Sequence, residues 1–165
     1  MFPGCTACGL LLVSDVSKPT HLAPPDSSVQ QYVARPALED AYAAAQQRVH
    51  QLQHHPEGWG YAGCTVECIE THISWLLLVG EHVYKLKKPL ALDFLDFSTP
   101  ALRLAACQEE LRINRRTAPH MYLDVVGVVG DGSDSRPWRV KPWAAGDAAG
   151  AEPAVLMRRF DQQAL

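Results

Sequence analysis

The sequence predicts an α+β fold, in which a twisted antiparallel sheet of about five strands carries one packed helix and a second helix leads into the sheet. Three observations favour this fold. Short apolar runs separated by turn residues occupy positions 66–88, an amphipathic helical pattern begins at Pro100, and an alanine-rich helical pattern runs from Pro36 to about His54. The 165 residues are enough for one domain with its own hydrophobic core.

Composition limits the classes of function. The chain is 47% hydrophobic and 20% charged, with a formal net charge of -3, so it is globular in composition and has no overall attraction for nucleic acid or an anionic membrane. Its longest apolar run is far short of a membrane span. Five cysteines without a recognisable secretion signal indicate a reducing compartment, and we expect a cytoplasmic protein.

Residues 1–35 are expected to be an irregular tail, and residues 36–165 the folded domain. Prolines and serines interrupt any regular pattern in the tail. Cys5 and Cys8 have the spacing of half a zinc site or of a redox pair. Neither a second ligand pair nor a strand-to-helix context is adjacent, so we interpret the spacing as coincidental.

The leading helix has one apolar face, which we expect to lie on the sheet. That face holds Leu38, Tyr42, Ala45, Val49 and Leu52. His50 and His54 stand one turn apart, as two metal ligands would, but solvated histidines are the better interpretation because no third ligand is near in the sequence. GWGYAG (58–63) matches GxGxxG, but it follows a helix and precedes a strand, so we predict a connecting loop.

Three apolar runs follow, at 66–70, 73–79 and 82–88. Thr71-His72 and Gly80-Glu81 separate them, and connections this short leave no room for a crossover helix. We therefore predict an antiparallel meander of three neighbouring strands.

The third run, VYKLKKP, carries the basic residues. The two-residue alternation of a strand places Val83, Lys85 and Lys87 on one face and Tyr84, Leu86 and Lys88 on the other. Lysines on a solvated edge strand are one explanation, because they discourage pairing with other sheets. The segment that follows favours a different one.

Thr99-Pro100 has the pattern of a helix start, and the helix is expected to run to about Arg116. Its buried stripe is predicted to contain Leu104, Cys107 and Leu111. Glu109 has Arg112 as a partner one turn on. Glu110 borders the apolar stripe and has no basic group at helical spacing, so we expect its partner to be a lysine of the sheet.

Further strands are expected at 122–130, within PWRVKPW as a short edge strand, and at 154–160 (AVLMRRF). Asp131-Gly132 is predicted as a turn and AAGDAAGAEP as a loop. Asp93 and Asp96 invite a paired-carboxylate hypothesis. Because Phe94, Leu95 and Phe97 surround them, we interpret them as the polar side of a packed connection.

Residues from about 64 to 165 resemble the opening part of a bacterial family of aminoglycoside-phosphotransferase-like proteins. Those proteins usually continue into a kinase large lobe and then a P-loop ATPase domain. The most specific segments are ETHISW, YKLKKP, LDFST, EELRINRR and AVLMRRF. The resemblance implies the small lobe of the protein-kinase-like fold, where a strand lysine holds the nucleotide phosphates and a helix glutamate holds the lysine.

The resemblance assigns roles residue by residue. Lys87 falls at the phosphate-binding position and Glu110 at the helix glutamate, and Lys85 remains an alternative one pleat earlier. ATP is the implied cofactor, and Met157 would line the adenine side of the cleft.

Thr71, His72 and Ser74 would sit where the first hairpin turns over the nucleotide. An alternative is that Thr71 and Ser74 merely satisfy the turn.

No segment matches the His-Gly-Asp-like or Asp-Phe-Gly-like loops of a large lobe, and no GxxxxGK[ST] is present. We therefore assign no catalytic residue here and expect magnesium ligands to come from a large lobe, in the same chain or a separate one. The expected function is a nucleotide-binding lobe that is inactive alone. The alternative is a non-catalytic module that binds a partner protein through its edge. A third interpretation, in which RINRR and Arg103 bind nucleic acid, is weakened by Glu109 and Glu110.

Overall fold

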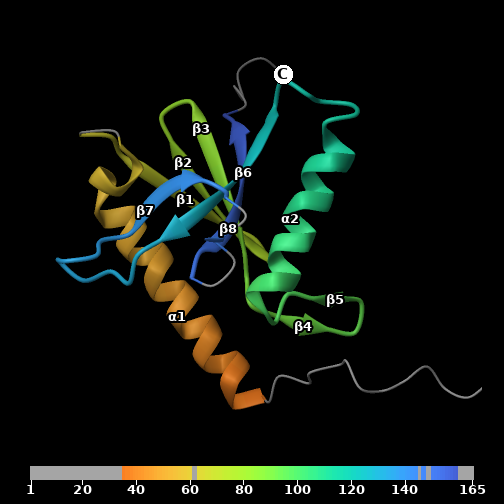
Figure 1. Ribbon diagram of the computed structural model, residues 1–165, viewed down its shortest axis with the longest axis horizontal. Coiled ribbons are helices and arrows are strands. Elements are labelled where there is room, and N and C mark those ends of the chain that lie inside the picture. Colours follow the sequence, from red (N-terminus) through yellow and green to blue (C-terminus); the bar gives the residue numbers. More distant parts are fainter. Residues whose placement is uncertain (1–34, 61–62, 145, 148–149, 160–165) are drawn as a thin grey trace, which may run out of the picture. The chain divides into compact units, whose positions relative to one another are not determined.

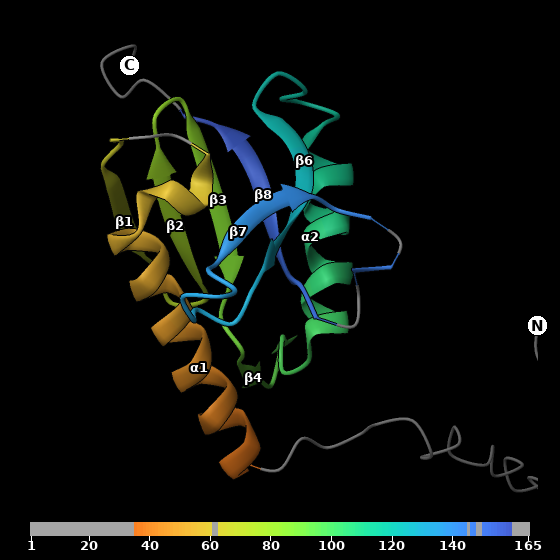
Figure 2. The same cartoon turned by 60° about the vertical axis from the view of Figure 1, so that its left-hand side comes forward.

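A six-stranded antiparallel sheet lies between two helices (Figures 1 and 2). The computed structural model describes residues 35–60, 63–144, 146–147 and 150–159. The elements are α1 (Arg35–His54), the 3-10 helix η1 (Pro56–Trp59), β1 (Val66–Glu70), β2 (Ser74–Val79), β3 (His82–Lys87), β4 (Ala91–Leu92), β5 (Leu95–Asp96), α2 (Pro100–Asn114), β6 (Tyr122–Val129), β7 (Arg139–Pro142) and β8 (Glu152–Arg158). The α+β prediction is confirmed, with six strands in the main sheet in place of about five.

The predicted meander is confirmed, since β1, β2 and β3 pair as antiparallel neighbours. Gly80 adopts a φ of 56° in the tight β2–β3 turn, a conformation that glycine reaches without strain. The sheet order is β1-β2-β3-β8-β6-β7. β8, the last strand of the described residues, therefore lies at the centre of the sheet, between β3 and β6. This position makes β3 an interior strand and rules out the solvated-edge explanation of its lysines.

α1 covers one face of the sheet with its predicted apolar stripe. Ala45, Val49 and Leu52 are buried against Trp75 and Leu77. GWGYAG begins in η1 and continues toward β1, so the prediction of a connecting loop is confirmed for its described residues. Within it, the buried Trp59 donates from Nε1 to the Leu52 carbonyl at 2.9 Å and packs on Tyr84.

α2 covers part of the other face and begins as predicted. The Thr99 hydroxyl accepts a hydrogen bond from the Leu102 amide, and Pro100 occupies the first turn. The helix ends at Asn114, two residues before the predicted end. Cys107 is fully buried with Val125 and Val155 in a second core cluster. Burial raises the pKa of the Cys107 thiol to about 12, so this residue packs as a small apolar group.

Two connections differ from expectation. Residues 91–96, which were interpreted as a packed connection, form the small β4–β5 hairpin, in which Phe94 is 83% exposed. Only Phe97 turns inward and is buried. β8 begins at Glu152, so the end of the predicted loop AAGDAAGAEP belongs to a central strand. The composition of the loop concealed this start, because alanine, glycine and proline dominate it.

The tail with Cys5 and Cys8, and Phe160 at the end of AVLMRRF, lie outside the described residues. Over the described part of the chain, neither helix has the length and apolar character that crossing a membrane requires.

Candidate functional site

Lys85, Lys87 and Glu110 form one ionic cluster between β3 and α2. Lys85 Nζ lies 2.7 Å from Glu110 Oε1, and Lys87 Nζ lies 2.7 Å from Glu110 Oε2. The prediction that Lys87 reaches Glu110 is confirmed, and Lys85 shares the same carboxylate. Alternation along β3 brings both lysines to the face that α2 covers, and the spacing of α2 places Glu110 beside buried Cys107.

The electrostatics of this cluster favour an anion. Burial of Glu110 raises its pKa, but the hydrogen bonds from Lys85 and Lys87 more than offset this, so the pKa lies below its ordinary value. Glu110 is therefore ionised at neutral pH. Two ammonium groups and one carboxylate leave a net charge of +1 in a half-buried place, where screening by salt is reduced.

An apolar strip of sheet lies beside the cluster. α2 packs on β8 and β6 and leaves the β1–β2 side of this face without a covering helix among the described residues. Strand alternation places five apolar residues on this face beside the cluster, and we call them the open strip: Ile69, Leu76 and Leu78 on β1 and β2, then Val83, which is buried, and Met157, which packs against the α2 core cluster. Ile69 is 46% exposed. The Arg159–Glu67 ion pair, at 3.0 Å, joins the end of β8 to β1.

In the turn between β1 and β2, the donors of Thr71 and the amide of Ser74, which were expected for phosphate, bond within the turn. The Thr71 amide and hydroxyl both donate to the Ser74 carbonyl, and the Ser74 amide donates to the Thr71 hydroxyl. These groups satisfy the turn itself, as the alternative interpretation has it. Ser74 is fully buried, so a ligand does not reach its hydroxyl, whereas His72 is exposed.

Sequence reasoning missed a second buried ion pair. Arg103, 4% exposed, donates from Nε and Nη2 to the two oxygens of Glu152, which is 6% exposed. Arg48 of α1 approaches the same carboxylate at 3.3 Å. Arg103 also donates to the carbonyls of Phe97 and Ser98. The sequence signal was the spacing of Arg103 from Cys107, one helical turn, which places the arginine on the buried stripe.

Lys88 binds on the opposite face of the sheet. Its Nζ lies 2.6 Å from Glu70 Oε1 and faces the rings of Trp75 and Tyr42 at 5.2 and 6.0 Å. As predicted from strand alternation, Lys88 lies on the same face of the sheet as Tyr84 and Leu86. Lys88 is thus committed to holding the end of β1 against α1 and takes no part in the cluster.

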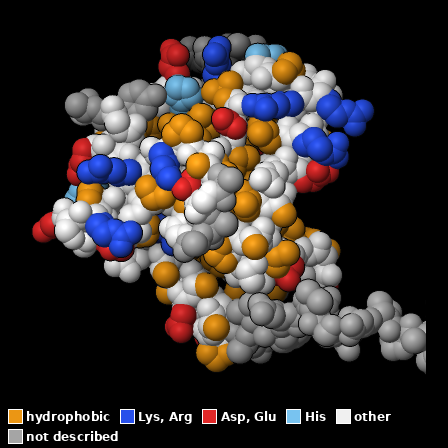
Figure 3. Space-filling view, in the orientation of Figure 1, with side chains coloured by type: hydrophobic (Ala, Val, Ile, Leu, Met, Phe, Trp, Pro, Cys, Tyr) orange, Lys and Arg blue, Asp and Glu red, His pale blue; other side chains and the backbone are white. Residues whose placement is uncertain are grey.

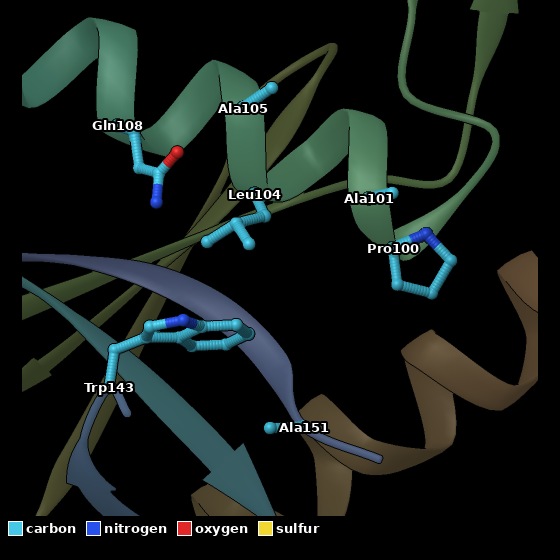
Figure 4. Close-up of a pocket in the computed structure, with 7 residues that line it drawn as sticks. All are labelled: Pro100, Ala101, Leu104, Ala105, Gln108, Trp143 and Ala151. Carbon is cyan, nitrogen blue, oxygen red and sulfur yellow. The ribbon is translucent and has the colours of Figure 1, made fainter. Parts of the chain in front are cut away.

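A separate apolar pocket lies between α2 and the segment after β7 (Figure 4). The indole of Trp143 faces Leu104 across it, and Gln108 lies at one end. Its remaining lining residues are Pro100, Ala101, Ala105 and Ala151. The volume is about 140 Å³, well below the ~300 Å³ at which ligand pockets usually begin.

Basic side chains also lie over the C-terminal end of α2 (Figure 3). Arg112 forms a two-bond pair with Glu109, and Arg115 donates to the carbonyls of Tyr122 and Leu123. These contacts serve α2 and its junction with β6, which further weakens the nucleic-acid interpretation of RINRR.

In the described residues, no group of three or more His, Cys, Asp or Glu side chains has a metal-binding arrangement.

The chain is similar to large mycobacterial proteins. It is 34% identical over 103 residues to the uncharacterized protein Rv2004c of Mycobacterium tuberculosis strain H37Rv, and to the uncharacterized protein Mb2027c of Mycobacterium bovis. The match covers 61% of this chain but only 17% of each relative. The chain therefore corresponds to about a sixth of the length of these relatives. No family model and no solved structure matches it.

Proposed function

We propose that this chain is the nucleotide-binding small lobe of a kinase-like phosphotransferase, related to the aminoglycoside-phosphotransferase-like proteins. The observation that carries the proposal is the cluster of Lys85, Lys87 and Glu110 beside the open strip. In kinases a lysine of the third strand holds the nucleotide phosphates and is itself held by a glutamate of the packed helix. The residue types, the elements and the pairing all agree with that arrangement.

The charge of the site supports a phosphate ligand. Each lysine ammonium has three donors, and Glu110 takes one from each. The remaining donors and the net charge of +1 suit a phosphate oxygen. The carboxylate prevents the two ammonium groups from repelling one another, so the lysines stay ordered in the absence of a ligand.

The open strip supports a base that stacks on an apolar surface. Val83 lies two residues before Lys85 on the same face, and Met157 pairs with Val83 across β3 and β8. Leu76 and Leu78 continue the surface on β2. An apolar floor with a few polar groups at one end is the usual composition of a small-molecule site.

The chemistry of transfer is assigned by the resemblance to other parts of a complete enzyme. Bound magnesium would neutralise phosphate charge, and a large lobe would supply its protein ligands and the acidic group that orients the acceptor. The residues of this chain bind and orient the nucleotide. The acceptor substrate belongs to that other lobe, so no antibiotic or other acceptor is proposed.

Calorimetric titration with magnesium-ATP tests the proposal. We expect the chain to bind one nucleotide. The triple variant Lys85→Met/Lys87→Met/Glu110→Leu should bind about a hundredfold more weakly, because the charged hydrogen bond to the phosphate and the positive charge of the cluster are both lost. This variant removes the whole ionic cluster together, so no buried charge is left unpaired and the fold should be kept.

Lys141→Ala is the matched control. Lys141 lies on β7 and pairs with Asp147, so its loss removes one positive charge away from the site. The control should bind magnesium-ATP as the unaltered chain does. The proposal fails if the unaltered chain binds no magnesium-ATP at millimolar concentration, or if the triple variant binds equally well.

One observation favours a second candidate, a module that binds a partner protein. Ile69 is a large apolar residue left 46% exposed on the edge strand β1. Exposed apolar surface is typical of interaction sites. Such a partner would need the open strip but not the lysines, so its binding would survive in the triple variant.

A further inference from the structure

The two lysines that share Glu110 have unequal surroundings. The side chain of Lys85 is 25% exposed, whereas that of Lys87 is 5% exposed. Both make an equally short contact with the carboxylate. Contact with Glu110 therefore does not separate their roles, but access to a ligand does.

Lys87 is closed in by Phe97 and Ser74. Its Nζ lies 5.0 Å from the centre of the Phe97 ring, a cation–π distance. Ser74 lies opposite Lys87 in the β2–β3 register and is fully buried. Phe97 is fixed from behind, since its amide donates to the Leu90 carbonyl and its carbonyl accepts from buried Arg103. These bonds fix the Phe97 backbone, and its side chain is buried at 6% exposed, so Phe97 closes this side of Lys87.

Lys85 faces the open strip. Its cross-strand neighbours are Leu76 on β2 and Val155 on β8, and Val83 precedes it on the same face. It is the accessible member of the cluster on the side where α2 leaves the sheet uncovered. A phosphate that follows a base lying on the open strip meets Lys85 first.

We infer that Lys85 is the lysine that contacts the phosphate and that Lys87 is a positioning residue. Lys87 holds one oxygen of Glu110, and so directs the other oxygen to Lys85. It also supplies the second positive charge, which keeps the cluster at +1. This assignment rests on the proposed function, and it differs from the sequence match, which placed the phosphate-binding role on Lys87.

Two double variants with equal charge separate the roles. Lys87→Met/Glu110→Gln keeps Lys85, and Lys85→Met/Glu110→Gln keeps Lys87; both leave one lysine and no carboxylate. We expect calorimetry to give magnesium-ATP binding within about tenfold of the unaltered chain for the first variant. The second variant should bind magnesium-ATP about tenfold to a hundredfold more weakly than the first, which corresponds to the free energy of one charged hydrogen bond. The reverse order would overturn the assignment while leaving the proposed function in place.

Lysine acetylation of the unaltered chain covers the case in which a variant does not fold. We expect mass spectrometry to find Lys85 acetylated in the free chain and protected by magnesium-ATP, and Lys87 acetylated only after unfolding in urea. Acetylation of Lys87 in the folded chain, with protection by magnesium-ATP at Lys87 but not at Lys85, would overturn the assignment. If calorimetry detects no binding of magnesium-ATP to the unaltered chain, the proposed function is overturned, and this inference with it.

Discussion

Replacing Glu152 with glutamine should lower the free energy of unfolding by about 3–5 kcal/mol, the cost of breaking a buried ion pair from one side. Arg103 would keep its charge in a place that is 4% exposed, with only neutral oxygens left to accept from it, namely the carbonyls of Phe97 and Ser98 and the amide oxygen of the new glutamine. Arg48 would lose the same partner. Urea denaturation gives the change directly, from the shift in midpoint at an unchanged slope.

The double replacement Arg103→Met/Glu152→Leu tests whether the stability lost in Glu152→Gln comes from the unpaired charge of Arg103. It removes the charges of Arg103 and Glu152 and fills their space with apolar groups, which in buried pairs is often neutral or stabilising, and it leaves Arg48, 18% exposed, over the Trp138 ring. We expect it to restore most of the stability lost in Glu152→Gln. Glu109→Gln, at an exposed glutamate of α2, should leave the midpoint unchanged. A Glu152→Gln variant as stable as the unaltered chain would contradict the buried pair.

Glu110→Gln should destabilise the chain by about 2–3 kcal/mol at neutral pH, because buried Lys87 and partly exposed Lys85 lose a shared carboxylate. The destabilisation caused by Glu110→Gln should become smaller as the pH falls. The pKa of Glu110 is lowered in the folded chain, because the lysine hydrogen bonds outweigh burial. A group with a depressed folded pKa stabilises the protein above its unfolded pKa, and this contribution is lost as the pH falls through the folded value.

The unfolded pKa of a glutamate is about 4.3. The difference in stability between the unaltered chain and Glu110→Gln should therefore be constant from neutral pH to about pH 5, and should shrink below it. Denaturation series at several pH values, with Glu109→Gln as the control, provide the comparison. A difference that grows on acidification, or that is absent at pH 7, would contradict the cluster geometry.

The sequence was sufficient for the parts of the fold that depend on local pattern. The N-cap of α2 comes from Thr99-Pro100, and the meander comes from two short connections, so neighbouring residues determine both. Glu110 was identified because it bordered an apolar stripe without a local partner. That reasoning predicted a sheet lysine and reached the correct strand, although it did not show that Lys85 and Lys87 would share the carboxylate.

Features that depend on distant pairing could not be predicted. The central place of β8 depends on its register with both β3 and β6, which no local pattern encodes. Glu152 was hidden for the same reason, since its partner Arg103 is 49 residues away. Phe94 was grouped with Leu95 and Phe97 in a packed connection because all three are apolar. Its exposure follows from the β4–β5 hairpin, in which Phe97 is the aromatic residue that turns inward.

The most direct test of the nucleotide site is an amide chemical-shift map of the ¹⁵N-labelled chain during titration with magnesium-ATP. We expect the shifts to gather on Lys85 and the open strip, with the amides of α1 unchanged. α1 packs in a separate core cluster on the opposite face of the sheet, so nucleotide binding at the ionic cluster should not shift the amides of α1. Shifts confined to α1 or to the pocket beside Trp143, or no shifts at millimolar nucleotide, would contradict the account.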